Sequence, residues 1–147
     1  MVLDHEFPPD IRVENEINSL KKAGCEVHLA CFTRTNKPLH EHYNGYIVYR
    51  RNISEFIYKS SVGCLKFPFY FNFWRTFIKN LFHQNLFDAI HIHDLPLAQI
   101  GYEVKNEFNI PFILDLHENW PAFVGAAAHT NTILGKFLSP VSLWEKY

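Results

Sequence analysis

The sequence predicts an α/β protein built on a doubly wound parallel sheet, and three observations lead to this class. Short apolar runs alternate with segments of helical hydrophobic spacing along most of the 147 residues. Hydrophobic residues make up 48% of the chain, which excludes a disordered protein. The length suits a single compact core and no linker divides it, so we expect residues 1–147 to form one domain. Strands that alternate with helices favour right-handed parallel crossovers.

The first half of the chain is expected to hold three strands and one helix. The apolar run 1–3 predicts the first strand. Asp10 is a typical helix cap, and the apolar spacing that follows it predicts a helix ended by Gly24. Further strands are expected over 26–32 and 46–49, with a polar loop between them.

The second half continues the alternation. Its expected elements are, in order, an aromatic helix over 67–82, a strand over 88–93, a helix over 97–108 and a strand over 111–116. Asn119 can cap a further short helix, and residues 140–147 begin another. No internal repeat interrupts this order.

Charge and cysteine usage narrow the class of protein. The net charge of −1 argues against a general nucleic-acid binder. That average hides a segment, 45–87, with six basic residues against one acidic and 13 of the 24 aromatic residues. Three cysteines without a CxxC pair favour buried thiols in a reducing compartment. With no signal-peptide pattern and no apolar run free of charge, we expect a cytoplasmic protein.

Three predicted strands end in similar sequences, and this is the most informative feature of the chain. The sequences are Leu3-Asp4-His5-Glu6, His91-Ile92-His93-Asp94 and Asp115-Leu116-His117-Glu118. In an open parallel sheet, ligands bind in the crevice outside the carboxyl ends of the strands. We therefore expect imidazoles and carboxylates to meet in one cleft there.

Each of these histidines also has a structural interpretation. His91 lies inside its strand, where packing and hydrogen bonding favour a core histidine. His93 and His117 follow at strand ends, where a functional role is favoured. His5 fits a loop cap as well as a site, and the carboxylates before these histidines have the alternative of bonding to nearby backbone.

A zinc site is a further alternative, which we do not favour. His91, His93 and Asp94 with His117 and Glu118 offer ligands, since side chains two residues apart share a strand face. Metal-dependent hydrolases with such a pair usually have a much larger barrel than this chain can form. We therefore expect no metal.

Phosphate binding has one candidate. The six glycines form no GxGxxG, Walker A or GxSxG motif. The helix after Asp10 offers free amides to an anion, and Arg12 adds a forked donor in its first turn. Alternatively, Arg12 pairs with Glu16 one turn on.

Three segments, in this order, resemble family 4 glycosyltransferases. The first is Pro8-Pro9-Asp10-Ile11-Arg12-Val13-Glu14-Asn15-Glu16 with Ala23-Gly24-Cys25-Glu26-Val27, where Cys25 replaces a histidine of the family's "AGHEV" turn. The second is Asp88-Ala89-Ile90-His91-Ile92-His93-Asp94, similar to "DVIHVHD". The third runs from Ile110-Pro111 to Asp115-Leu116-His117-Glu118, similar to "IPLVYDSHE". The final Leu143-Trp144-Glu145-Lys146-Tyr147 also matches, whereas 37–87 does not.

The resemblance implies one Rossmann-like, three-layer α/β/α half of a GT-B fold. It further implies a retaining hexosyltransferase that moves a sugar from a nucleotide-sugar donor to a glycan or lipid-linked acceptor, as in polysaccharide biosynthesis. The family's C-terminal domain, which binds the nucleotide sugar and carries the Glu-x7-Glu signature, has no counterpart in this sequence. The isolated domain is therefore expected to be inactive without that partner domain.

The resemblance also implies roles for individual residues. His117 would contact the donor sugar near its reacting centre, with Glu118 beside it as the second catalytic residue. His93, Asp94 and His5 would line the acceptor cleft. Arg12 would approach the donor diphosphate or an anionic acceptor, because the loop Glu6-Phe7-Pro8-Pro9 lacks the glycines of many relatives. No cofactor and no metal is implied.

Two other function classes remain open. One is a nucleotide-sugar epimerase of the same architecture, which acts on the donor alone. The other is a non-enzymatic, flavodoxin-like binding module that uses the histidine-rich edge for recognition. A C-terminal donor segment would favour the transferase over both.

The aromatic segment suggests a membrane partner. A docking surface for an anionic membrane would use Phe67, Phe71 and Trp74 with Arg75 and Lys79, and would make the protein peripheral at the inner face. The alternative, slightly favoured, is a helix packed on the sheet with its outer face covered by another domain or a second copy.

Overall fold

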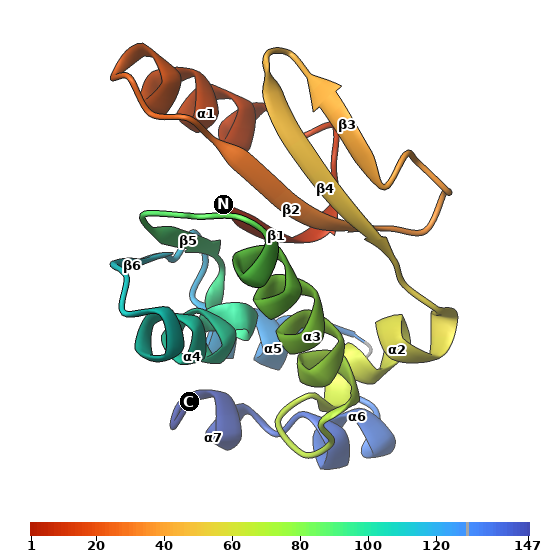
Figure 1. The fold of residues 1–147 in the computed structure, drawn as a ribbon. Helices are drawn as coiled ribbons and strands as arrows, with labels where there is room; N and C mark the ends of the chain where they lie inside the picture. Colours follow the sequence, from red (N-terminus) through yellow and green to blue (C-terminus); the bar gives the residue numbers. More distant parts are fainter. Residues whose placement is uncertain (129) are drawn as a thin grey trace.

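The computed structural model describes residues 1–128 and 130–147, which form a six-stranded sheet with helices on both faces (Figure 1). The strands, in chain order, are β1 (Val2–Glu6), β2 (His28–Thr33), β3 (His40–Tyr43), β4 (Tyr46–Asn52), β5 (Ile90–His93) and β6 (Phe112–Asp115). Their order across the sheet is β3-β4-β2-β1-β5-β6; β3 pairs antiparallel with β4, and the other four strand pairs are parallel.

Three helices form the outer layers. Helix α1 (Ile11–Lys22) covers one face, and α3 (Phe69–Gln84) and α4 (Ala98–Phe108) cover the other (Figure 1). Each face has its own apolar core, one around Leu3, Leu29 and Val48 and the other around Trp74 and Ile92. The predicted α/β class and its Rossmann-like three-layer arrangement are confirmed.

Helix α1 begins where the sequence indicated. The Asp10 side chain accepts hydrogen bonds from the amides of Arg12 and Val13 at 3.0 and 3.1 Å, which satisfies two of the free donors of the first turn. Val13 and Ile17, four residues apart, are buried against the sheet. Gly24 follows the helix with a φ of 90°, a conformation that costs other residues more than glycine.

The expected polar loop before β4 contains a strand that the sequence analysis missed. β3 pairs with β4 through the turn Asn44-Gly45, whose φ values of 48° and 79° fit a two-residue hairpin. His40, Glu41 and His42 in β3 are polar, as suits an edge strand in contact with solvent, and so they gave no apolar alternation.

The aromatic helix packs on the sheet, which was the alternative to the membrane surface. Phe71 and Trp74 are 6% and 0% exposed, so the expectation that they belong to an exposed docking surface is wrong. Arg75 donates to Glu103 at 2.7 Å and Lys79 pairs with Glu107, both on α4. These two cations therefore join α3 to α4.

Short helices complete the described chain. They are α2 (Glu55–Ser60), η1 (Ser61–Gly63), η2 (Leu95–Leu97), α5 (Trp120–Ala126), α6 (Ile133–Leu138) and α7 (Val141–Trp144). Asn119 caps α5, as expected, by accepting from the amide of Ala122 at 3.2 Å. In residues 1–128 and 130–147, no helix is long and apolar enough to cross a membrane.

The three cysteines are free thiols. Cys31 and Cys64 are buried, as the sequence suggested, and burial raises the pKa of Cys31 to about 11. Cys25 is exposed, because it follows Gly24 in the turn after α1.

Candidate functional site

The connections of the sheet locate the site. β1 lies between β2 and β5, and the chain leaves β1 through α1 on one face but leaves β5 through α4 on the opposite face (Figure 1). A crevice opens at such a switch point, beside the carboxyl ends of the two strands. The histidine- and carboxylate-rich sequences end at this edge.

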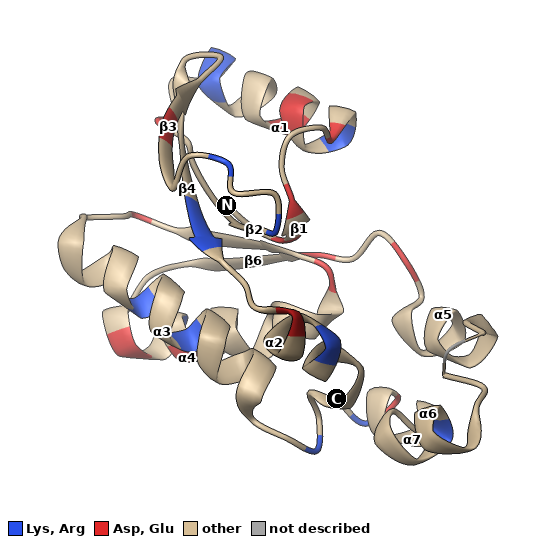
Figure 2. Cartoon of the chain, turned by 90° about the vertical axis from the view of Figure 1, so that its right-hand side faces the viewer, with Lys and Arg blue, Asp and Glu red and all other residues tan. Residues whose placement is uncertain are grey.

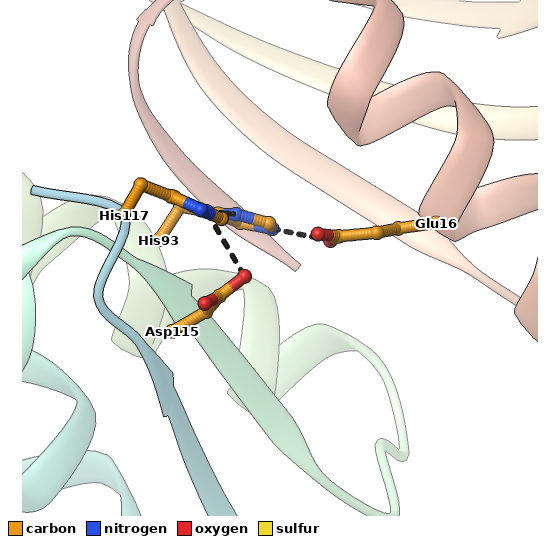
Figure 3. Close-up of side chains that lie close together, drawn as sticks. All are labelled: Glu16, His93, Asp115 and His117. Carbon is orange, nitrogen blue, oxygen red and sulfur yellow. Dashed lines mark hydrogen bonds and ion pairs between the residues drawn. The ribbon is translucent and has the colours of Figure 1, made fainter.

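Four side chains from three elements meet there (Figure 3). His93 ends β5, and Asp115, its register partner, ends β6. His117 Nε2 lies 2.9 Å from Asp115 Oδ2 and 3.3 Å from His93 Nδ1. From the second turn of α1, Glu16 Oε2 approaches His93 Nε2 to 3.6 Å. We call these four residues the His–carboxylate cluster.

Burial sets the charge of this cluster. The side chain of His93 has no exposed surface, and burial, followed by the charges of His91 and the N-terminus, lowers its pKa to about 3. Burial and the charge of Asp115 raise the pKa of Glu16. His93 is therefore a neutral imidazole at neutral pH, and its ring stacks on that of His117 with centroids 5.6 Å apart.

A second titratable pair lies at the same edge. Asp4 follows Leu3, which faces α1, so by strand alternation its side chain lies on the face covered by α3. Burial, and next the charge of Asp94, raise the pKa of Asp4 to about 7. Asp94 itself has a φ of 68°, a strained backbone conformation for a residue other than glycine, and such strain is often found at functional sites.

The polar side chains at the end of β1 form hydrogen bonds with neighbouring loops and with the cap of α1. His5 Nε2 lies 3.1 Å from Asp10 Oδ2, the carboxylate that caps α1. Partial burial would raise the pKa of Glu6, but hydrogen bonds from Thr35, Thr33 and the Arg34 amide outweigh it and lower that pKa to about 2. His5 thus adopts the loop-capping alternative while 42% of its side chain stays exposed.

Arg12 lies between the cap and the cluster. Its ion pair runs to Asp10, with Nη2 3.6 Å from Oδ2, rather than to Glu16 as the alternative interpretation had it. Its Nε is buried without a hydrogen-bond partner among the described residues. The guanidinium therefore keeps an unused donor beside the first turn of α1.

The other predicted site residues lie outside the cluster. His91 is partly buried inside β5 and stacks on His93 with centroids 4.5 Å apart, in agreement with the structural interpretation. Glu118 is exposed, next to His117 in the chain. Of the ligands considered for a zinc site, His93 and His117 lie in the cluster, whereas His91, Asp94 and Glu118 do not.

Glu16 is the member that the sequence did not predict, since it was considered only as a partner of Arg12. Asp115 was expected at this edge of the sheet, with bonding to nearby backbone as its alternative, and it precedes His117 by two residues. The sequence alone does not indicate that α1 and the end of β6 lie close together.

A groove of about 1190 Å³ lies at the opposite end of the strands, where they begin, and extends as far as Glu16 of the cluster. It runs between the end of α1 and the end of α3, over the first residues of β1, β2 and β5, and touches Glu16 and His91. Because the strands begin there, it opens away from the crevice in which ligands of such sheets bind.

Comparison with known proteins gives one family. The model of a family described as Glycosyltransferase Family 4 matches residues 11–147. No match was found among curated proteins or among solved structures. The matched range includes Arg12, the whole His–carboxylate cluster and Glu118.

Proposed function

Since the chain belongs to glycosyltransferase family 4, we propose that it is the acceptor-side domain of a retaining glycosyltransferase. The enzyme would move a hexose from a nucleotide-sugar donor to a glycan or lipid-linked acceptor. A C-terminal domain that binds the nucleotide would close over the crevice. Neither a cofactor nor a metal takes part in the proposed transfer step.

The observation that carries this proposal is the meeting of His117 with His93, Asp115 and Glu16 at the switch point. Asp115 and His93 both contact Nε2 of His117, so they fix the orientation of its ring. A fixed imidazole at the mouth of the crevice suits a contact with the sugar close to its reacting carbon. Glu118, exposed beside it, would be the second contact.

His93 takes a different role from the one expected. Because its side chain is fully buried, it does not line an open acceptor cleft; we propose it as a positioning residue for His117. Asp94 and the exposed part of His5 remain as proposed acceptor contacts. The partly buried Asp4 extends that group, since a carboxyl with a pKa near 7 can both donate to and accept from a sugar hydroxyl.

Arg12 and the beginning of α1 would receive the donor diphosphate or an anionic acceptor. The unpartnered Nε of Arg12 and the positive end of the helix dipole both favour an anion. Asp10 occupies two amides of this turn, so the side chain of Arg12 would supply most of the contact.

The proposed chemistry is a front-face displacement. The bond between the anomeric carbon and the diphosphate oxygen breaks while the acceptor oxygen bonds to the same face of that carbon. The proton of the acceptor hydroxyl passes to the leaving diphosphate. The domain contributes orientation and electrostatic stabilisation rather than a general base.

We also propose an anionic membrane as the place of action, through Phe67, which was expected from the sequence, and two residues that were not. Phe56, Phe67 and Phe69 are 64%, 43% and 44% exposed, and the ring of Phe69 contacts those of Phe56 and Phe67, with centroids 5.4 and 6.3 Å apart. We call them the aromatic surface. Three basic residues lie on α2, on α6 and in the loop before α3, the elements that carry or adjoin these aromatic residues (Figure 2); they are Lys59, Lys136 and Lys66.

The test is sugar transfer by the native enzyme that carries this chain, with labelled nucleotide sugars as donors. His117→Ala should lower kcat/KM by at least about 100-fold, because an orienting contact at the reacting centre is lost. His83→Ala is the matched control, since His83 is exposed on α3, pairs with Glu107 on α4 and is no member of the cluster, and should leave transfer unchanged. Full turnover by His117→Ala would overturn the assignment.

The same assay separates the alternatives. An epimerase would change the donor sugar in the absence of any acceptor, whereas the proposed transferase would release nucleotide and extend the acceptor. A binding module would do neither with any donor. Product analysis by mass spectrometry distinguishes these three results.

A further inference from the structure

We propose that Glu16, His93, Asp115 and His117 form a binding site for one divalent cation of the zinc class. One ligand atom from each of the four residues lies within 4.8 Å of the ligand atoms of the other three. Figure 3 shows the two imidazole rings side by side, with Glu16 reaching His93 and Asp115 reaching His117. The proposal concerns the chain itself and does not depend on sugar transfer.

The donor set selects the metal. Two imidazole nitrogens and two carboxylate oxygens are ligands that zinc accepts in a four-coordinate arrangement. Zinc–ligand bonds of about 2.0–2.2 Å place tetrahedral ligand atoms roughly 3.3–3.6 Å apart. His93 Nε2 and Glu16 Oε2 already lie 3.6 Å apart, and the Asp115–His117 pair lies at 2.9 Å. The other pairs of ligand atoms lie within 4.8 Å, so the side chains would move together, and the stacked imidazole rings would turn, as the ion binds.

A second, independent observation points to a missing ligand. His93 Nε2 and Glu16 Oε2 are both buried and have no hydrogen-bond partner in the described residues. The 3.6 Å between them is too long for a hydrogen bond. Buried polar atoms normally have partners, so two that face each other across such a gap fit a cation between them.

The elements that hold the ligands are fixed by the fold. His93 and Asp115 are register partners on adjacent parallel strands, and the Asp94 amide donates to the Asp115 carbonyl at 2.9 Å beside them. Glu16 comes from α1, whose Val13 and Ile17 are fully buried in the core on the same face. Three separate elements would thus be joined by one ion, and two carboxylates would balance its charge.

One consequence rests on the proposed function. A cation at this site would occupy the imidazole of His117 that we assign to the donor sugar. Zinc and donor should therefore compete, and zinc should inhibit transfer by the native enzyme in a way that a chelator reverses. Should zinc bind without inhibiting transfer, the metal site would stand and the assignment of His117 to the sugar would fall.

The test uses the 147-residue chain, stripped of metal by dialysis against EDTA and titrated with zinc chloride by calorimetry. We expect one zinc ion per chain at this site, checked by elemental analysis after desalting. Glu16→Gln and Asp115→Asn, which keep the shape of each side chain, should each weaken binding by at least about tenfold, as losing even an outer contact of a metal site does.

Two matched controls identify the site. Glu14→Gln changes a carboxylate on the same helix, and His83→Gln removes an exposed imidazole, so both should bind zinc like the wild type. Cobalt(II) gives a second readout, since only the wild type and the controls should show the visible absorption of a tetrahedral ion. The absence of stoichiometric zinc, equal affinity in all variants, or an octahedral cobalt spectrum in the wild type would each overturn the proposal.

Discussion

Arg50 is a charged residue that the fold encloses completely, since its side chain has no exposed surface. Its Nε donates to the Phe7 carbonyl at 3.1 Å, and its Nη1 donates to the Pro38 carbonyl at 2.8 Å and pairs with Glu41 at 2.7 Å. One guanidinium thus joins the loop after β1, the loop after β2 and the edge strand β3. A single residue therefore connects three segments, and Lys37, whose Nζ donates to the Pro8 carbonyl at 2.6 Å, also joins the first two of them.

Removing this guanidinium should be costly. Arg50→Met should lower the free energy of unfolding by about 3–5 kcal/mol, because Glu41 and two carbonyls lose their partner. Urea unfolding followed by circular dichroism measures it. Arg34→Met, which removes the exposed partner of Glu55, is the control and should cost less than about 1 kcal/mol. Equal losses in the two variants would contradict the role given to Arg50.

Asp4 should make stability depend on pH. Its pKa of about 7 in the folded state lies above the value of 3.8 expected when unfolded, so the folded chain keeps a proton that the unfolded chain releases. Asp4 therefore reduces stability progressively as pH rises from about 4 to 7. Asp4→Asn should gain in free energy of unfolding relative to the wild type over this range and level off above it.

Urea unfolding of both proteins at several pH values between 4 and 8.5 checks this, and subtraction removes the contributions of all other groups. A difference between the two proteins that stays constant with pH would show that Asp4 titrates normally.

For individual residues, the sequence predicted part of the site. His93 and His117 were placed at one edge because strand ends meet there, and the sheet brings them to 3.3 Å. The burial of His93 was not predictable, since it depends on α1 covering the end of β5. The place of Glu16 in the cluster was not predictable for the same reason. It depends on the packing of α1 at the end of β5, which brings Glu16 next to His93, 77 positions later in the chain.

At the scale of elements, α4 packs closely against β5 and β6 through Gly101. A Cβ at Gly101 would lie 2.7 Å from Ile92 Cγ1 and would also clash with the ring of Phe112. Gly101→Ala should therefore destabilise the protein by about 1–3 kcal/mol, although alanine favours helices. Urea unfolding of the variant checks this value.

Gly125→Ala in α5 is the control, because the nearest side-chain atom, in Val141, would lie 3.5 Å from the new Cβ. This variant should be neutral or slightly stabilised. A Gly101→Ala protein as stable as the wild type would mean that α4 can move away from the sheet without loss.

Elements with apolar periodicity were predictable, as were the two short helices indicated by Asn119 and by residues 140–147, whereas β3, α2 and α6 were not. The helix after Asp10 and the strands over 26–32 and 88–93 follow hydrophobic spacing and appear as α1, β2 and β5. β3 was missed because an edge strand with two polar faces has no such spacing. α2 and α6 were missed because they are six residues long, and their caps, Ser54 and Thr132, were the only signals.

For the whole molecule, the aromatic and basic residues that the sequence grouped together divide between two places. Part of the group forms the core between α3 and the sheet, and the aromatic surface stays outside. The sequence could not divide them, because a helix rich in aromatic residues on several sides does not indicate which side meets the sheet.

The aromatic surface should bind membranes. The native enzyme should float with vesicles of anionic lipid and much less with neutral ones, since a lysine near such a surface contributes about 1 kcal/mol, although Lys59 is paired with Glu55 and contributes less. Phe56→Ser with Phe69→Ser should reduce flotation severalfold. Tyr102→Ser, at an exposed position on α4, should not. A wild type that fails to float would end the membrane proposal.

The order of the strands also gives the sheet two unlike borders. β3 borders it with polar side chains, whereas β6 borders it with Ile113, 52% exposed, and is followed by Leu116, 54% exposed. Unpaired backbone beside exposed apolar side chains is a template on which another chain can add a strand. Self-association at high protein concentration would therefore begin at β6, at the same border from which Asp115 reaches the cluster.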